Sequence, residues 1–249
     1  MSLPEANTRY SASVNRRMML LRESQARIRP SMMPDLPKTE VAILEMTNAF
    51  RKENALTALK ADPKLTAAAR AYAGYLATSG KFAHEADGQK PAQRAEAAGY
   101  KFCFIAENLA MDANSKGFST RGLAEEAMSG WKSSPMHRAN LLRSGVTDIG
   151  VGVAKAPDHP GKYISVQMFG LPESQRLAFK IENAAGVPIE YRLSGKPHTL
   201  GEGKTITYRS CGSMPLTFPA GARVEYQPVN GEHFIVRTQG PGKIVVDRK

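Results

Sequence analysis

Apolar residues recur at helical spacing through the first half of the chain. This spacing predicts a helix over residues 38–59, with Thr39 as its N-cap. A second helix is predicted to begin at Asp62-Pro63, because proline suits the first helical turn, and to stop at Gly80. Shorter helices are expected over residues 91–98 and 122–131.

The pattern changes to short β-rich runs in the second half. Residues 148–154 and 163–169 predict a hairpin, since a cluster of turn residues at 157–161 separates them. Further strands are predicted at residues 177–181, 189–193, 204–208, 215–218, 223–228 and 233–237. Turns containing Gly or Pro separate these runs, which is typical of a small all-β module, either a sandwich or a small barrel. We expect the boundary of this module near residues 172–176.

Composition fits one large or two modest domains, because the chain has 249 residues and 42% of them are hydrophobic. The formal net charge is +11, but basic residues are scattered among acidic ones along most of the chain. No aromatic-rich basic motif appears, so we do not expect nucleic acid as a partner. The predicted organisation is a flexible basic segment (residues 1–37), a helix-containing domain (38–172) and a small all-β domain (173–249).

The first 37 residues hold the densest basic cluster, at Arg16-Arg17, Arg22, Arg27 and Arg29. With its prolines and few aromatics, this segment is expected to be a solvated tail, the alternative being a surface-binding arm. Residues 18–21 are too short for a signal-peptide core, and no apolar run approaches the roughly 20 residues of a membrane span. A chain whose export signal has been removed would look the same, so the sequence leaves the location open.

The two cysteines, Cys103 and Cys211, are too few for a zinc-finger pattern and do not form a Cys-x-x-Cys pair. Because Phe102 and Phe104 flank Cys103, we favour a buried small hydrophobic residue there over a reactive thiol. A bridge between the two cysteines is the less favoured alternative, open to an exported protein.

Several standard sites are excluded. His84-Glu85 begins like a zinc-protease helix, but Gly88 stands where the second histidine should be. The chain has no Gly-x-Ser-x-Gly elbow, phosphate loop, dinucleotide fingerprint or EF-hand spacing. The usual hydrolase, kinase and redox signatures are therefore missing.

A dispersed set of polar residues remains, formed by His84, Glu107 and His137. Two imidazoles and a carboxylate can supply three ligands to a divalent metal and leave one position for water, which suits Zn²⁺. Without metal they could act as general acid and base only beside a nucleophile or a bound water. From the residues alone, structural roles are favoured, with Glu107 as a buried carboxylate and His137 tying a turn to the sheet.

The motifs around these residues resemble the bacterial branch of the CAP superfamily, whose domain is also called SCP. The superfamily includes cysteine-rich secretory proteins, insect venom antigens and plant pathogenesis-related proteins. The resemblance covers roughly residues 40–170, with every segment in the family's order. The matching segments are His84-x-x-Asp87-Gly88 with Arg94, Ala97-x-Gly99-Tyr100, Ala106-Glu107-Asn108-Leu109-Ala110, Trp131-x-x-Ser134-Pro135-x-His137-Arg138-x-Asn140-Leu141-Leu142 and Ile149-Gly150-Val151-Gly152-Val153-Ala154.

This resemblance implies an α+β protein, with an α-β-α sandwich and a cleft holding two histidines and acidic residues. By motif the cleft residues are His84, Glu107 and His137, which are also the expected metal ligands. Ser134 stands where eukaryotic members have a second glutamate, and Glu125 or Glu126 is the candidate to compensate. We therefore include Ser134 and Glu126 among the expected ligand-binding residues.

The leading hypothesis is an exported bacterial CAP protein, periplasmic or secreted, that is monomeric and non-enzymatic. Its cleft would bind Zn²⁺ or another divalent cation, or a small ligand such as a lipid, without an organic cofactor. The alternative is a metal-dependent hydrolase acting on peptide or cell-wall substrates, with His84, Glu107 and His137 as catalytic candidates. In a third interpretation, the basic strands of the C-terminal module contact an acidic cell-envelope polymer.

Overall fold

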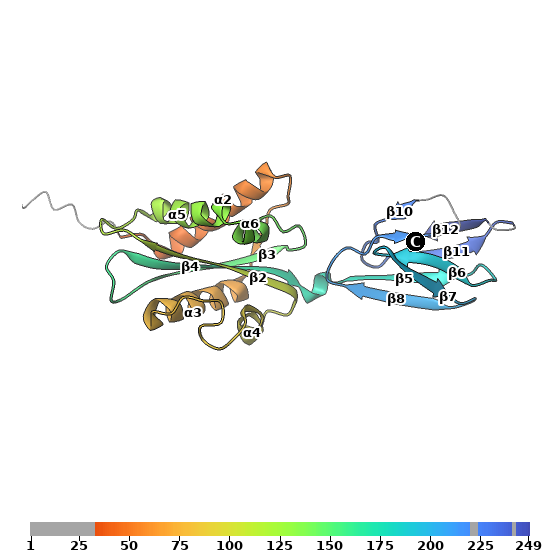
Figure 1. Ribbon diagram of the computed structural model, residues 1–249, viewed down its shortest axis with the longest axis horizontal. Coiled ribbons are helices and arrows are strands. Elements are labelled where there is room, and N and C mark those ends of the chain that lie inside the picture. Colours follow the sequence, from red (N-terminus) through yellow and green to blue (C-terminus); the bar gives the residue numbers. More distant parts are fainter. Residues whose placement is uncertain (1–32, 220–223, 241–242) are drawn as a thin grey trace, which may run out of the picture.

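The structure is a computed structural model that describes residues 33–219, 224–240 and 243–249. The predicted tail of residues 1–37 lies outside the described residues up to residue 32. Figure 1 shows two parts that follow one another along the long axis, a helix-containing domain and an all-β module. Within the described residues, no helix has both the length and the apolar character needed to cross a bilayer.

Local capping signals determine where the helices begin and end. The helices are α2 (Leu36–Glu53), α3 (Pro63–Ser79), α4 (Pro91–Ala97), α5 (Thr120–Ser133) and α6 (Pro135–Leu141). The start of α3 at Asp62-Pro63 is confirmed: the Asp62 carboxylate accepts from the Lys64 and Leu65 amides, and Gly80 ends the helix with a φ of 69°.

The prediction for the first helix was wrong at both ends. Asp35 caps α2, accepting from the Lys38 amide at 3.1 Å, and the helix ends at Glu53. Thr39, the expected cap, lies buried inside the helix, where its hydroxyl donates to the Asp35 carbonyl at 2.9 Å. Thr39 is a good cap by type, but it belongs to the helix because Asp35 and a proline in the first turn start it earlier.

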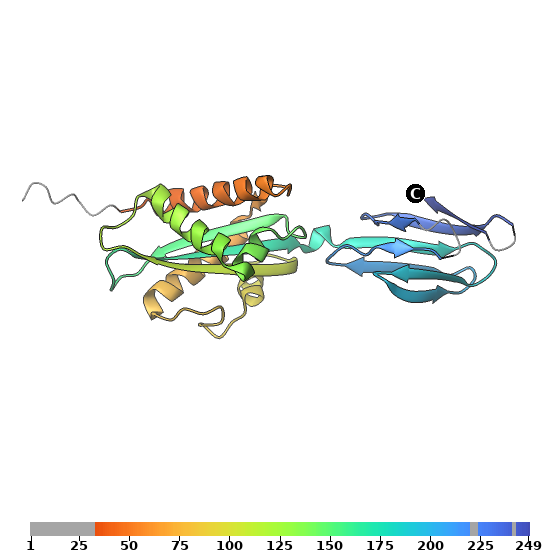
Figure 2. The same ribbon diagram turned by 45° about the horizontal axis from the view of Figure 1, so that its top comes forward.

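A four-stranded sheet separates two helical layers in the order β1-β3-β4-β2. Its strands are β1 (Lys60–Ala61), β2 (Phe102–Ala113), β3 (Asp148–Lys155) and β4 (Lys162–Pro172). The predicted β3–β4 hairpin is confirmed, whereas the long edge strand β2 and the two-residue β1 were not predicted. Figures 1 and 2 show α2, α5 and α6 on one face of this sheet and α3 and α4 on the other, which is the expected α-β-α sandwich.

Each face of the sheet has its own hydrophobic core. One cluster joins α2 and α5 to the sheet around Ile43, Trp131 and Phe169. The other joins α3 to the sheet around Tyr72 and Met168. Strand β3 makes room for α3 through Gly150 and Gly152, because a Cβ atom on either glycine would overlap the α3 backbone.

We predict that Gly150→Ala destabilises the domain by about 2–4 kcal/mol, because rigid backbone on both sides cannot move apart cheaply. Gly74→Ala, in the middle of α3 with open space at its Cβ, should instead stabilise by about 0.5–1 kcal/mol. Urea denaturation of both variants measures the contrast. Equal stabilities for the two variants would contradict the close approach of β3 and α3.

The C-terminal module is a sandwich of two four-stranded sheets. A short 3-10 turn, η1 (Glu173–Gln175), leads from β4 into the module. The sheets have the orders β12-β11-β5-β8 and β10-β9-β6-β7 and share one core. The strands are β5 (Leu177–Asn183), β6 (Ile189–Leu193), β7 (Lys196–Leu200), β8 (Thr205–Ser210), β9 (Leu216–Thr217), β10 (Glu225–Tyr226), β11 (His233–Thr238) and β12 (Ile244–Arg248). Strands β7 and β12 were not predicted.

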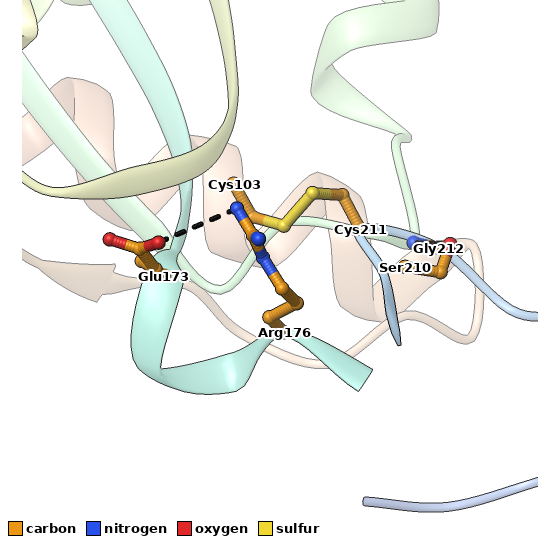
Figure 3. Close-up of a disulfide and its surroundings, with 6 residues drawn as sticks. All are labelled: Cys103, Glu173, Arg176, Ser210, Cys211 and Gly212. Carbon is orange, nitrogen blue, oxygen red and sulfur yellow. Dashed lines mark hydrogen bonds and ion pairs between the residues drawn. A yellow bond between two sulfur atoms is a disulfide. The ribbon is translucent and has the colours of Figure 1, made fainter. Parts of the chain in front are cut away.

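A disulfide between Cys103 and Cys211 joins the two parts, with the Cα atoms 5.3 Å apart. The prediction that Cys103 is a buried small hydrophobic residue was therefore wrong. Cys103 lies at a bulge, where the pairing of β2 with β4 shifts between Phe102 and Phe104. Such an extra residue is unpaired and can turn away from its neighbours. Figure 3 shows the bridge beside η1, where Arg176 pairs with Glu173 at 3.5 Å.

We predict that reducing this disulfide lowers the free energy of unfolding by up to about 4–5 kcal/mol, because it closes a loop spanning 108 residues. Urea titrations with and without dithiothreitol measure the effect. The double variant Cys103→Ser/Cys211→Ser should match the reduced protein and be insensitive to reductant. An oxidised wild type no more stable than this variant would refute the prediction.

Candidate functional site

His84 lies in the loop between α3 and α4, and two tyrosines of α3 hold this loop. The Tyr72 hydroxyl contacts the Ala83 carbonyl and accepts from the Ala86 amide at 3.1 Å. The Tyr75 hydroxyl donates to the Ala86 carbonyl at 2.9 Å. The loop is therefore tied to α3 on both sides of His84.

Arg94 of α4, which is buried, also binds this loop through hydrogen bonds. Its Nη1 donates to the Asp87 carboxylate at 2.9 Å and to the Gln89 carbonyl at 2.7 Å. Its Nη2 donates to the His84 carbonyl at 2.9 Å, and the guanidinium stacks over the Tyr72 ring at 3.4 Å. Arg94 is buried and forms salt bridges with Asp87 and Glu107.

Glu107 joins this loop to strand β2. Its carboxylate accepts from Arg94 Nη2 at 2.9 and 3.2 Å and lies 2.8 Å from His84 Nδ1. The Glu107 side chain is 1% exposed, whereas that of His84 is 50% exposed. A carboxylate beside a guanidinium is an acceptor, so His84 donates from Nδ1, and Nε2 is the ring nitrogen left to face a ligand.

His137 reaches the same edge of the sheet from the opposite layer. Burial, and then the neighbouring charge of His84, lower the pKa of His137 below its ordinary value. Since β2 is an edge strand, a side chain from α6 on one face can approach a side chain from the α3–α4 loop on the other. His84 and His137 therefore lie on segments that meet β2 from opposite faces of the sheet, His84 through Glu107 and His137 through the bond of its carbonyl with Asn108.

A chain of amide side chains anchors α6 to β2. Asn108 donates to the His137 carbonyl at 3.2 Å, and Asn140 donates to Asn108 at 2.9 Å and to the Glu107 carbonyl at 3.2 Å. Asn108 also donates to Gln167 at 3.3 Å, and Gln167 donates to Thr47 at 2.8 Å. Gln167 and Thr47 were not among the predicted site residues, and their only signal was a polar residue within an apolar run.

The remaining expected site residues have different positions. Ser134 is the N-cap of α6, one turn before His137, and its side chain makes no capping hydrogen bond. Glu126 of α5 lies near Asp112 of β2. Asp112 comes five residues after Glu107, and a strand rises ~3.3 Å per residue, so these two residues are about 16 Å apart along the strand. An odd separation also places Asp112 and Glu107 on opposite faces of the strand. The structure therefore does not bring Glu126 to His84 and Glu107.

The expected three-ligand metal set is not assembled. Residues 33–219, 224–240 and 243–249 contain no group of three or more His, Cys, Asp or Glu side chains arranged to hold a metal ion. The physical reason lies in Glu107, whose oxygens already contact Arg94 and His84. The donors left to an incoming ligand are the imidazoles of His84 and His137.

Comparison with known proteins identifies the family. The model of the family described as "CAP: Cysteine-rich secretory protein family" matches residues 44–169, just over half of the chain. The chain belongs to the CAP family. Its CAP domain is thus the α-β-α sandwich that carries His84, Glu107 and His137, and the β sandwich follows it.

Individual relatives match about half of the chain. Uncharacterized protein YkwD of Bacillus subtilis (strain 168) is 30% identical over 118 residues, which are 47% of this chain and 43% of YkwD. The chain thus matches less than half the length of that relative. Among solved structures, an outer surface protein from Borrelia burgdorferi is 24% identical with a TM-score of 0.48, over 54% of this chain and 93% of that one. An extracellular SCP-domain protein from Bacillus anthracis strain Ames is also 24% identical, with a TM-score of 0.44, over 54% and 41% of the two chains.

Asp112 supplies a pH-dependent prediction. Burial, and then the charge of Glu126, raise the pKa of Asp112 to about 6, above its ordinary value of 3.8. The folded protein therefore binds this proton more tightly than the unfolded chain, and stability falls as the pH rises from about 4 to 6. Asp112→Asn should raise the free energy of unfolding at pH 7 by roughly 1–2 kcal/mol, after discounting for solvent near this partly exposed carboxyl.

Urea denaturation of wild type and Asp112→Asn between about pH 4 and 8 measures this effect, and the two stabilities should converge near pH 4. Glu126→Gln serves as the control, and it should reproduce only a minor part of the gain because burial is the larger cause. A constant difference between Asp112→Asn and wild type across this range would show that Asp112 does not titrate as stated.

Proposed function

We propose that this chain is an exported, non-enzymatic binding protein of a bacterial cell envelope. Its candidate site at the outer edge of β2 takes a small amphiphilic ligand, whose polar group contacts His84 and His137. The observation that carries this proposal is the half-exposed His84 ring, which Glu107 holds through Nδ1 at 2.8 Å so that Nε2 is available to a ligand.

The chemistry of the cleft favours a ligand with a hydroxyl or carboxyl group and an apolar part. His84 Nε2 accepts a hydrogen bond, and the lowered pKa of His137 favours its neutral ring at neutral pH. Large apolar side chains are exposed close by in sequence, with Phe82 two residues before His84 and Met136 next to His137. Met136 is 81% exposed, which is unusual enough for a methionine to suggest contact with an apolar partner.

The disulfide supports the exported location. Cys103 and Cys211 are bonded, and disulfides persist in oxidising compartments and are rare in the cytosol. The description of the family, cysteine-rich secretory proteins, agrees with this location.

A fluorescent fatty-acid analogue and a fluorescent sterol are suitable probes. We predict that wild type binds at least one of them and that His84→Ala weakens this binding about tenfold, which corresponds to one lost hydrogen bond of about 1.4 kcal/mol. The matched control is His159→Ala, which removes an exposed imidazole from the β3–β4 turn. Fluorescence titration gives the dissociation constants, and circular dichroism checks folding. Failure of wild type to bind either probe, or equal affinities in all three proteins, would refute the proposal.

The His84–Glu107 pair also favours a second candidate, a hydrolase of peptide or cell-wall substrates. A carboxylate that holds one imidazole nitrogen can orient the ring as a general base. Turnover of such substrates by wild type, lost in folded His84→Ala and His137→Ala variants, would replace the binding proposal with this one. Ligand binding without turnover would remove it.

A further inference from the structure

Glu107 has almost no capacity left for another partner. One of its oxygens contacts His84 Nδ1 at 2.8 Å and Arg94 Nη2 at 3.2 Å, and the other accepts from Arg94 Nη2 at 2.9 Å. The carboxylate is 1% exposed, so a metal ion and its water molecules cannot approach it directly. A divalent ion would have to displace the guanidinium to gain an oxygen ligand.

Arg94 is difficult to displace. It is 7% exposed, contacts the carboxylates of both Asp87 and Glu107, and stacks on Tyr72. A guanidinium remains charged at every relevant pH and offers several donors in a fixed plane. It therefore already supplies positive charge to this pair of carboxylates.

We propose that Arg94 is the resident cation of the cleft in this chain. Its guanidinium takes the carboxylate that the family resemblance assigns to a divalent metal, so Glu107 is a partner of Arg94 and His84 and not a metal ligand. A metal ion that enters the cleft is held by the imidazoles of His84 and His137, without Glu107. This inference is independent of which amphiphile the cleft takes.

The experiment is a double-mutant cycle for Zn²⁺ binding, measured by calorimetry at neutral pH with the metal alone. Arg94→Gln frees Glu107 beside the His84 imidazole, and we expect the affinity for Zn²⁺ to rise at least about tenfold over wild type. The double variant Arg94→Gln/Glu107→Gln should lose that gain. Arg94→Lys keeps a positive charge against Glu107 and should remain within about threefold of wild type.

The matched control is Arg138→Gln, which removes the same charge from an exposed residue next to His137. It should leave the Zn²⁺ affinity within about threefold of wild type, whereas an effect of general electrostatics would raise it as in Arg94→Gln. An equal gain in both variants, or no gain in Arg94→Gln, would overturn the proposal.

Wild type provides a second measurement if Arg94→Gln does not fold. A crystal structure with Zn²⁺ should show the ion on imidazole nitrogens, with the Arg94–Glu107 pair intact. A Glu107 oxygen about 2.0–2.2 Å from the ion would overturn the proposal.

Discussion

The candidate site depends on one buried charge, the guanidinium of Arg94. Burying such a group is unfavourable unless its donors are satisfied. Here Nη1 and Nη2 bond to the carboxylates of Asp87 and Glu107 and to two loop carbonyls, while the buried Nε has no hydrogen-bond partner among the described residues. The same bonds fix the loop that carries His84 and connect it to strand β2. Loss of one partner of a buried pair costs about 3–5 kcal/mol, so the position of His84 and the stability of this part of the domain are coupled.

Helices and strands could be predicted from the sequence where residues close in the chain mark both ends of the element. Helix α3 begins and ends as expected because Asp62, Pro63 and Gly80 act within one turn of its ends. Strand β2 escaped prediction because Glu107 and Asn108 interrupt its apolar run, although both are buried. The hydrogen-bond partners of Glu107 and Asn108 lie on α4, α6 and β4, so they could not be identified from the sequence of β2 itself.

The site shows the same division. The family resemblance indicated His84, Glu107 and His137, and the structure places the first two in contact and His137 close enough for the charge of His84 to lower its pKa. The role of Arg94 could not be predicted, because its contacts with Glu107 and Tyr72 require α4 to pack against α3 and β2. The position of Glu126 relative to the site could not be predicted from its place on a helix alone. The bulge at Cys103 could not be predicted either, because the neighbouring residues Phe102 and Phe104 are typical of a regular buried strand.

The bridge between Cys103 and Cys211 also determines how the chain would bear mechanical load. When the two ends are pulled apart, tension passes from the first residues of β2 through the sulfur atoms to the segment after β8. The enclosed stretch, which contains Glu107, α5, α6, β3 and β4, lies outside that path. While the disulfide is intact, a chain stretched from its two ends would thus keep the backbone around His137 and Glu107 off the covalent path of the load, whereas the loop bearing His84 would lie on that path.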